Sequence, residues 1–191
     1  MQILKQILKI LSFIFKPRDK RYGRKVYDTN SLIYRLPTQK ELDNISSEWQ
    51  SGMELIGWHY LSSRDEINSK IMLEGIQAVI SDCHNKRIKF PEAEFKNIYD
   101  LDKVLGYVYG DVFVNEFNWE WIYLIIKDDN PKWAIISPNR KLIIRTNRIF
   151  INHFLKVDTF FDFIRLYNQV KYGKLKVGKK VIETNKTMIL N

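Results

Sequence analysis

The sequence predicts an α+β domain, in which N-terminal helices are followed by an antiparallel sheet of three to four strands and a closing C-terminal helix. Residues 38–117 carry apolar side chains at helical spacing, whereas residues 119–154 form short apolar runs separated by turn residues. The composition, 45% hydrophobic and 14% aromatic with only 8 Gly and 5 Pro, is typical of an ordered globular chain. A length of 191 residues fits one domain with appended ends.

The first 25 residues predict an amphipathic helix followed by a basic linker. Eight apolar side chains fall on one arc of about 160° when residues are placed 100° apart. These residues are Ile3, Leu4, Ile7, Leu8, Ile10, Leu11, Ile14 and Phe15. Pro17 should end the helix, because the residue before a proline is pushed out of the α region. The basic cluster at its end consists of Lys16, Arg18, Lys20, Arg21, Arg24 and Lys25.

Three kinds of neighbour fit this segment. The apolar face could pack on the domain's own core or on a twofold mate in a homodimer, with the lysines in solvent. It could also lie in an anionic membrane surface, since Lys on the polar face and an adjacent basic run are typical of such helices. Nucleic acid is the third candidate, but no helix-turn-helix, zinc finger or aromatic RNA-binding signature accompanies the basic cluster.

Two capping boxes predict helix starts in the middle of the chain. Thr38 with Glu41, and Ser63 with Glu66, each place a hydroxyl at an N-cap and a Glu three residues later. The first helix should continue to Ile56. The second should run from Ile67 through Ile71, Leu73, Ile76 and Val79 to Ile80.

A third helix is predicted from Leu101 to about Phe117, with Asp100 as its N-cap. Gly106 and Gly110 lie four residues apart on one face of this helix. Each interior glycine costs about 1 kcal/mol relative to alanine, so their presence predicts that another element approaches the helix backbone there.

Four strands and a last helix complete the expected fold. The strands are predicted at residues 119–126, 133–137, 141–146 and 149–154, with turns at 128–131 and 138–139. A helix should follow from Asp158 or Thr159 to Gly173, which would end it. The chain is therefore divided into residues 1–25, a domain at 26–173 and a Lys-rich, loose tail at 174–191.

The residue pattern does not predict catalysis. It contains no interpretable Ser/His/Asp arrangement, phosphate-binding loop or pair of carboxylates at a working spacing. Asp111 and Glu116 are the carboxylates nearest to such a role, but no partner is fixed beside them by spacing. Cys83 and His84 are adjacent on a helix and point in different directions, which disfavours a joint metal site. We expect a non-enzymatic protein with no catalytic residue, cofactor or metal.

The sequence favours a cytoplasmic protein, with association to a membrane surface as the alternative. No apolar run approaches the roughly 18 to 20 residues that span a bilayer. Lys5 and Lys9 interrupt the apolar stretch that a secretory signal would need. The single cysteine excludes an internal disulfide framework.

Charge is distributed in blocks along the chain. Residues 1–25 hold eight Lys and Arg against one acid, residues 38–130 hold nine against seventeen, and residues 131–191 hold thirteen against three. Such blocks influence association and partner choice more than they influence the fold. The opposite signs also predict that the basic ends fold back on the acidic helices within the monomer.

The run Leu105-Gly-Tyr-Val-Tyr-Gly-Asp111, with the Trp119-Glu-Trp121 strand, Trp133 and Pro138-Asn-Arg140, resembles an uncharacterised family of small bacterial proteins. In that family a Leu-Gly-x-x-x-Gly-Asp helix runs into a Trp-bearing hairpin. The layout is also similar to immunity proteins encoded beside secreted antibacterial toxins, and the resemblance covers roughly residues 38–170. It implies a protein that binds and masks a cognate toxin, with no catalytic residues. The acidity usual in nuclease-binding immunity proteins is present here only in the middle block.

Overall fold

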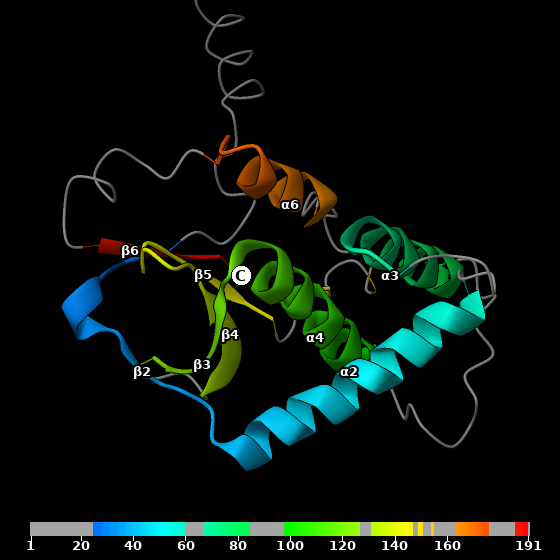
Figure 1. Cartoon of the computed structure of the whole chain (residues 1–191), viewed down its shortest axis with the longest axis horizontal. Coiled ribbons are helices and arrows are strands. Elements are labelled where there is room, and N and C mark those ends of the chain that lie inside the picture. Colours follow the sequence, from blue (N-terminus) through cyan, green and yellow to red (C-terminus); the bar gives the residue numbers. More distant parts are fainter. Residues whose placement is uncertain are drawn as a thin grey trace, which may run out of the picture.

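A computed structural model describes residues 25–59, 67–84, 98–126, 131–146, 149–150, 154, 163–175 and 186–190. Within these residues the chain forms an α+β fold of four helices and one curled, mixed sheet of six strands (Figure 1). The α+β class predicted from the sequence is therefore confirmed. The helix predicted over residues 3–15 lies outside the described residues, as does the basic cluster except for Lys25.

The elements follow one another in an order that begins and ends with strands. They are β1 (Lys25–Asp28), the 3-10 turn η2 (Thr29–Ser31), β2 (Ile33–Arg35), α2 (Gln39–His59), α3 (Ser69–His84), α4 (Ile98–Phe117), β3 (Glu120–Ile125), β4 (Lys132–Ile136), β5 (Leu142–Arg145), α6 (Phe163–Lys171) and β6 (Lys186–Leu190).

The sheet has the strand order β1-β6-β5-β4-β3-β2, and its two edge strands are consecutive in the sequence. A flat sheet would separate these edges by five strand spacings, or roughly 24 Å. The five residue steps from Asp28 to Ile33 reach at most about 18 Å. The short connection through η2 therefore requires the sheet to curl, as it does in Figure 1.

The predicted sheet was wrong in strand number and direction. The observed sheet has six strands, not three or four, and its strands β5 and β6 pair in parallel, with Leu142 opposite Met188. β1 and β2 precede the helices, while β6 comes from the segment that we predicted to be a loose tail. Strands of three and four residues are too short to show a periodicity, and β6 follows a Lys-rich run and has only three consecutive apolar residues at its end.

A strand was also predicted at residues 149–154. The residues of this range that the structure describes, 149, 150 and 154, are not in a strand. Ile149 and Phe150 form a buried bend, and the Phe150 N–H donates a 2.6 Å hydrogen bond to Oδ1 of Asp102. Asp102 lies on α4 and is only 2% exposed. The Asp102 carboxylate therefore holds the bend against α4. Its hydrogen bond satisfies the Phe150 N–H, which a neighbouring strand would satisfy in a sheet.

Helix boundaries follow their capping residues. At α2 the predicted capping box is confirmed: the Thr38 N–H donates to Glu41 Oε2 at 2.8 Å, and the Glu41 N–H donates to Thr38 Oγ1 at 3.4 Å. α3 starts later than predicted, after Asn68, whose Oδ1 accepts from the backbone N–H groups of Lys70 and Ile71. The box predicted at residues 63–66 lies outside the described residues.

The other two helices end and begin near their predicted positions. α4 begins at Ile98, so Asp100 lies in its first turn and is not the N-cap. α6 ends at Lys171, and Gly173, which has φ +61°, terminates it in the turn that follows, as predicted. The Gly173 and Lys174 N–H groups donate to the carbonyls of Val170 and Gln169, the pattern of a Schellman motif.

Both faces of the sheet are buried. The outer face packs against the helices, with α4 beside the sheet and α2 and α3 against α4 (Figure 1). Its buried strand residues are Trp121, Ile135, Leu142, Ile144, Met188 and Leu190. The inner face encloses a second, aliphatic cluster of Ile122, Leu124, Ala134, Ile136, Ile143 and Ile189. Burial on both sides explains the nearly continuous apolar character of these strands.

α4 approaches the outer face most closely at its two glycines. A Cβ at Gly106 would collide with the carbonyl oxygen of Thr146 and lie 3.1 Å from the carbonyl carbon. A Cβ at Gly110 would lie 2.8 Å from Cζ2 of Trp121. Neither position has room for a side chain, because the sheet and the segment after β5 occupy that space.

Candidate partner-binding surfaces

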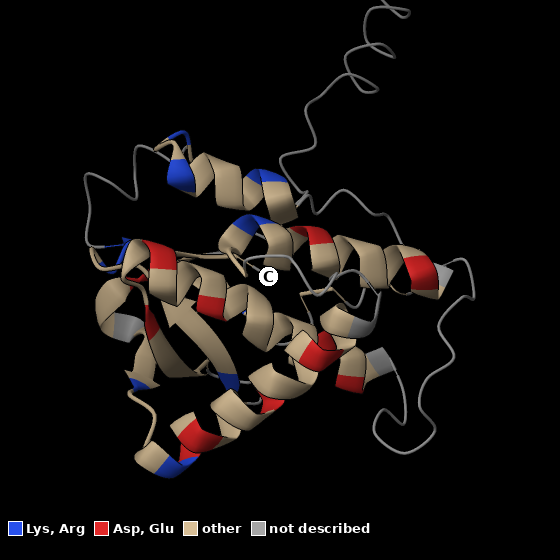
Figure 2. Cartoon of the chain, turned by 45° about the vertical axis from the view of Figure 1, so that its right-hand side comes forward, with Lys and Arg blue, Asp and Glu red and all other residues tan. Residues whose placement is uncertain are grey.

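The described part of the chain divides into two regions of opposite charge. Its residues between 38 and 126 carry eleven acidic and three basic side chains, whereas those between 131 and 190 carry eight basic ones and no acidic one. Figure 2 shows the acidic residues on the helical layer of α2, α3 and α4, and basic residues on α6. All described residues together hold 13 Lys and Arg against 12 Asp and Glu. Nearly all of the net charge of +9 therefore belongs to residues outside this part.

Ion pairs join the two regions. Arg140 Nη2 lies 2.7 Å from Glu120 Oε2, and Lys171 Nζ lies 2.8 Å from Glu116 Oε1. Part of the C-terminal basic block therefore contacts the acidic middle of the same chain, as the opposite signs of the two blocks predicted. The same prediction for the N-terminal basic block falls on residues outside the described part, apart from Lys25.

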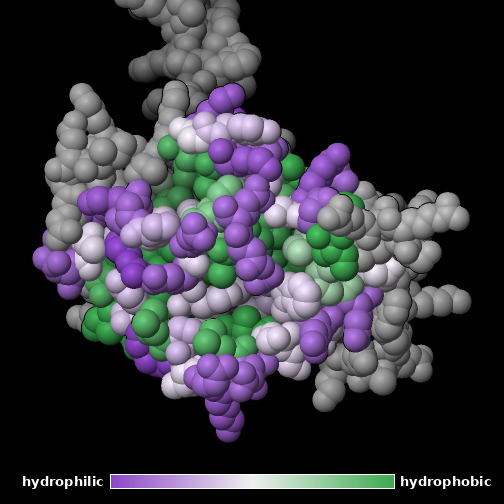
Figure 3. All heavy atoms as spheres, viewed as in Figure 1, coloured by the Kyte–Doolittle hydropathy of each residue, from purple (hydrophilic) through white to green (hydrophobic). Residues whose placement is uncertain are grey.

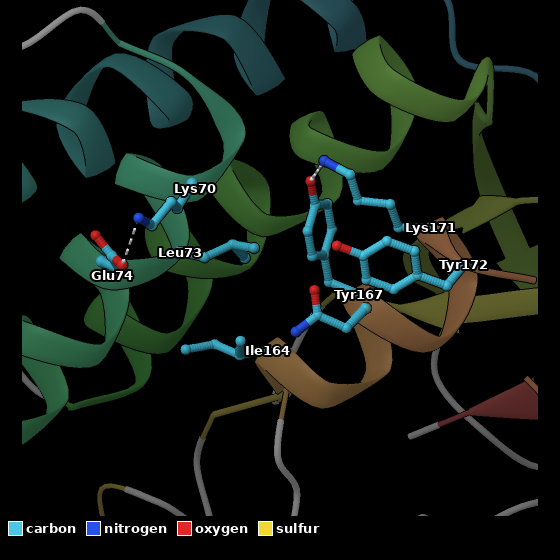
Figure 4. A pocket seen from close by; sticks show the side chains of 8 residues that line it. Lys70, Leu73, Glu74, Ile164, Tyr167, Lys171 and Tyr172 are labelled. Atoms are coloured by element: carbon cyan, nitrogen blue, oxygen red, sulfur yellow. Dashed lines mark hydrogen bonds and ion pairs between the residues drawn. The ribbon is translucent and has the colours of Figure 1, made fainter. Parts of the chain in front are cut away.

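A pocket of about 250 Å³ lies between α3 and α6 (Figure 4). Its lining residues are Lys70, Leu73, Glu74, Ile164, Tyr167, Asn168, Lys171 and Tyr172. The two helices bring together residues that lie about one hundred positions apart. The pocket combines an aliphatic and aromatic lining with charged side chains of both signs.

One wall of this pocket is fixed by three polar side chains. Tyr167 Oη donates to Glu116 Oε2 at 2.6 Å, and Lys171 Nζ donates to Tyr167 Oη at 3.0 Å. Lys171 also pairs with Glu116, so the three groups close a ring between α6 and the end of α4. The Tyr109 hydroxyl adds a 3.1 Å hydrogen bond to the Phe163 carbonyl oxygen, which fixes the start of α6.

The directions of the three pKa shifts are those expected of a structural clamp. Burial raises the pKa of Glu116, but hydrogen bonds from Lys171, Tyr167 and Ser69 outweigh it and hold the pKa below its ordinary value. Burial and the bond to Glu116 raise the pKa of Tyr167. The bonds to Glu116 and Tyr167 raise the pKa of Lys171. A lowered pKa would favour Tyr167 as a base at neutral pH, and here the pKa moves the other way.

The two carboxylates singled out in the sequence serve different contacts. Glu116 belongs to the clamp, whereas Asp111 accepts a 2.8 Å hydrogen bond from Asn115 on the same helix. Burial raises the pKa of Asp111. The structure therefore does not bring Asp111 and Glu116 together as an acid and base pair.

A second constellation connects β2 to α2. Arg35 makes a bidentate pair with Glu41, with N···O distances of 2.7 and 2.6 Å, and its guanidinium lies 4.4 Å from the ring centre of Tyr123. Tyr123 in turn contacts the Trp133 ring edge to face at 4.8 Å. Hydrogen bonds from Arg35 and Thr38 lower the pKa of Glu41 to about 2. This stack fastens an edge strand to the first helix.

Exposed apolar side chains gather near the same edge strand. Ile33 on β2 is 63% exposed and Leu36 just after it is 62% exposed. Figure 3 shows hydrophobic atoms at the surface in this part of the molecule and again around α6, between hydrophilic side chains. Both areas are surface features that sequence periodicity did not indicate.

Reactive and metal-binding chemistry finds little support in the described residues. Burial, with a smaller contribution from Asp82, raises the pKa of the Cys83 thiol to about 11, so it is protonated at neutral pH. No group of three or more His, Cys, Asp or Glu in the described ranges is placed to hold a metal ion. Nor does any described helix have the length and apolar character needed to cross a membrane.

Comparisons of the chain with protein-family models, curated proteins and solved structures found no match. The resemblance to toxin immunity proteins therefore stays a prediction from a few aromatic and glycine positions.

Proposed function

We propose that this chain works without catalysis by binding another protein, in the manner of an immunity protein that masks a cognate bacterial toxin. The observation that carries the proposal is the charge separation of a nearly neutral body into an acidic helical layer and a basic remainder. A partner protein can present both signs and match such a surface. Nucleic acid is uniformly anionic, so it would be attracted to one region and repelled by the other.

The toxin part of the proposal draws its support from the sequence resemblance. The Gly106 and Gly110 helix and the Trp-bearing hairpin carry that resemblance, and both belong to the buried core. Immunity proteins inhibit by occupying a surface of the toxin, so the chain needs no active site of its own for this role.

Capture of the partner and rescue from its toxicity test this function. The tagged full-length chain should retain one protein in a stoichiometric complex, with a Kd on the order of 1 nM, and the complex should survive nuclease treatment. Production of the chain should also restore growth to cells that express a toxin encoded beside it. Absence of any stoichiometric protein partner, together with absence of growth rescue, would overturn the proposal.

A second candidate is attachment to an anionic membrane surface on the cytoplasmic side through residues 1–25. The observation that favours it is the near neutrality of the described residues. Most of the net charge of +9 therefore lies outside them, and residues 1–25 alone supply +7. Each basic residue near such a surface contributes about 1 kcal/mol.

Vesicle binding separates this candidate from the first. The full chain should co-sediment with vesicles of mixed phosphatidylserine and phosphatidylcholine at low salt, and a chain lacking residues 1–24 should not. Equal sedimentation of the two chains, or none of either, removes the membrane candidate and leaves protein binding untouched.

A further inference from the structure

The pocket between α3 and α6 has the size of a site for side chains. Its volume of about 250 Å³ lies just below the roughly 300 to 1,000 Å³ of pockets that enclose small-molecule ligands. Leu73, Ile164 and the ring of Tyr167 supply its apolar surface, and Figure 4 shows them between the two helices. Such a hollow can take one or two large side chains from a partner and remove them from water.

The rim of the pocket carries charges of both signs, and its basic side chains are the more exposed ones. The side chain of Lys70 is 79% exposed and lies 3.8 Å from Glu74, a pair so open to solvent that it contributes little. Lys171 spends two of its three N–H donors on Tyr167 and Glu116. Residues 163–175 contain no acidic residue.

The pocket wall is also held in place before any partner arrives. The clamp of Glu116, Tyr167 and Lys171 fixes one turn of α6, so little side-chain freedom is lost there on binding. At the edge stands Tyr172, which is 63% exposed. A tyrosine beside a preformed hollow is a common centre of binding energy in protein interfaces.

Resting on the protein-binding function proposed above, we propose that this pocket receives a large apolar side chain of the partner protein, with an adjacent Asp or Glu that pairs with Lys70. The apolar side chain supplies contact area and the carboxylate fixes its orientation. The surface by which the chain recognises its partner is then the border between α3 and α6.

Blocking the pocket tests this assignment. Asn168 is exposed at the rim, so Asn168→Trp places an indole over the hollow without entering the core. Gln50→Trp puts the same side chain on the exposed face of α2 and serves as the matched control. Unchanged thermal unfolding, followed by circular dichroism, verifies that both variants fold.

The probe is a phage-displayed library of 12-residue peptides selected on the full chain. Enriched peptides should pair a large apolar residue with Asp or Glu, and their Kd by fluorescence anisotropy should rise at least tenfold with Asn168→Trp and less than twofold with Gln50→Trp. Lys70→Glu should weaken them about fivefold at low salt and less at high salt. Enrichment of Lys- or Arg-rich peptides, no enrichment at all, or affinities that Asn168→Trp leaves unchanged would overturn the proposal.

Capture of the partner by the wild-type chain and by Asn168→Trp distinguishes failure of the pocket proposal from failure of the protein-binding function. If the wild-type chain and Asn168→Trp retain the same partner equally well, the chain binds a protein but not through this pocket. If neither retains a partner, the protein-binding function itself fails.

Discussion

The two faces of the sheet are buried in different ways. On the outer face, aromatic side chains such as Trp121 meet the helices, and α4 comes close enough that Gly106 and Gly110 have no room for a Cβ. On the inner face, short aliphatic side chains meet one another across the curl, without an aromatic ring among the six that are fully buried. Helices cover one face of the sheet, whereas the curvature required by the η2 connection buries the other.

The largest expected difference comes from neighbouring isoleucines on β5. Ile144 faces the helices and Ile143 faces the inner cluster, and both are 0% exposed. We expect Ile144→Ala to lower the free energy of unfolding by about 4 kcal/mol and Ile143→Ala by about 2 kcal/mol, because the inner cluster can collapse further as the sheet tightens.

Urea denaturation measures both values. Equal losses, or a larger loss for Ile143→Ala, would mean that the curl is as rigid as the helical layer.

A smaller effect is expected from a pair of glycine substitutions. Gly106→Ala should lower the free energy of unfolding by about 3 kcal/mol, since its methyl group would meet the backbone of Thr146 and the helix would have to move. Gly57→Ala on α2 should raise it by about 0.5 to 1 kcal/mol, because a Cβ there meets nothing within 4 Å and helix propensity improves.

Thermal and urea unfolding measure the change in the free energy of unfolding for both glycine variants. A Gly106→Ala protein as stable as the Gly57→Ala protein would contradict the close contact between α4 and the outer face.

The smallest expected effect on stability comes from the Arg35–Glu41 pair, which connects the edge strand β2 to α2. The pKa of Glu41 is about 2, below its ordinary value of 4.5, so its pair with Arg35 stabilises the fold above about pH 4.5 and stops doing so as pH falls toward 2. Glu41→Gln should therefore lower the unfolding temperature slightly at pH 6, and the gap to the wild type should shrink toward pH 2.

A series of thermal melts between pH 2 and 6 measures that gap. A constant gap would show that the Arg35 contact does not fasten β2 to α2.

The strands β3, β4 and β5 and much of the helical layer could be predicted from the sequence, whereas β1, β2 and β6 could not. The capping box of α2, the extent of α4 near Phe117 and the strand at Trp121 follow from local residue patterns. β1, β2 and β6 depend on pairing between residues as distant as Lys25 and Ile189, which no window of sequence contains.

The candidate site was missed for the same reason. Only the spacing of Tyr167 and Lys171, one helical turn apart, hints at their contact. Their carboxylate partner, Glu116, lies about fifty positions earlier, and Lys70 on the opposite rim lies about one hundred positions earlier. The charge blocks were visible from the start, but the ion pairs that join them depend on the fold.

The position of β6 sets the order in which this sheet can form. β6 lies between β5 and β1, so β1 has no hydrogen-bonded neighbour in the described sheet until residues 186–190 have been made. During synthesis β1 leaves the ribosome early and waits for more than 150 residues before its partner appears. Closure over so long a loop is slow compared with helix packing. We therefore expect a nascent chain to assemble its helical layer first and to complete its sheet last, and cleavage before residue 186 to remove β6 and leave β1 without its described neighbour.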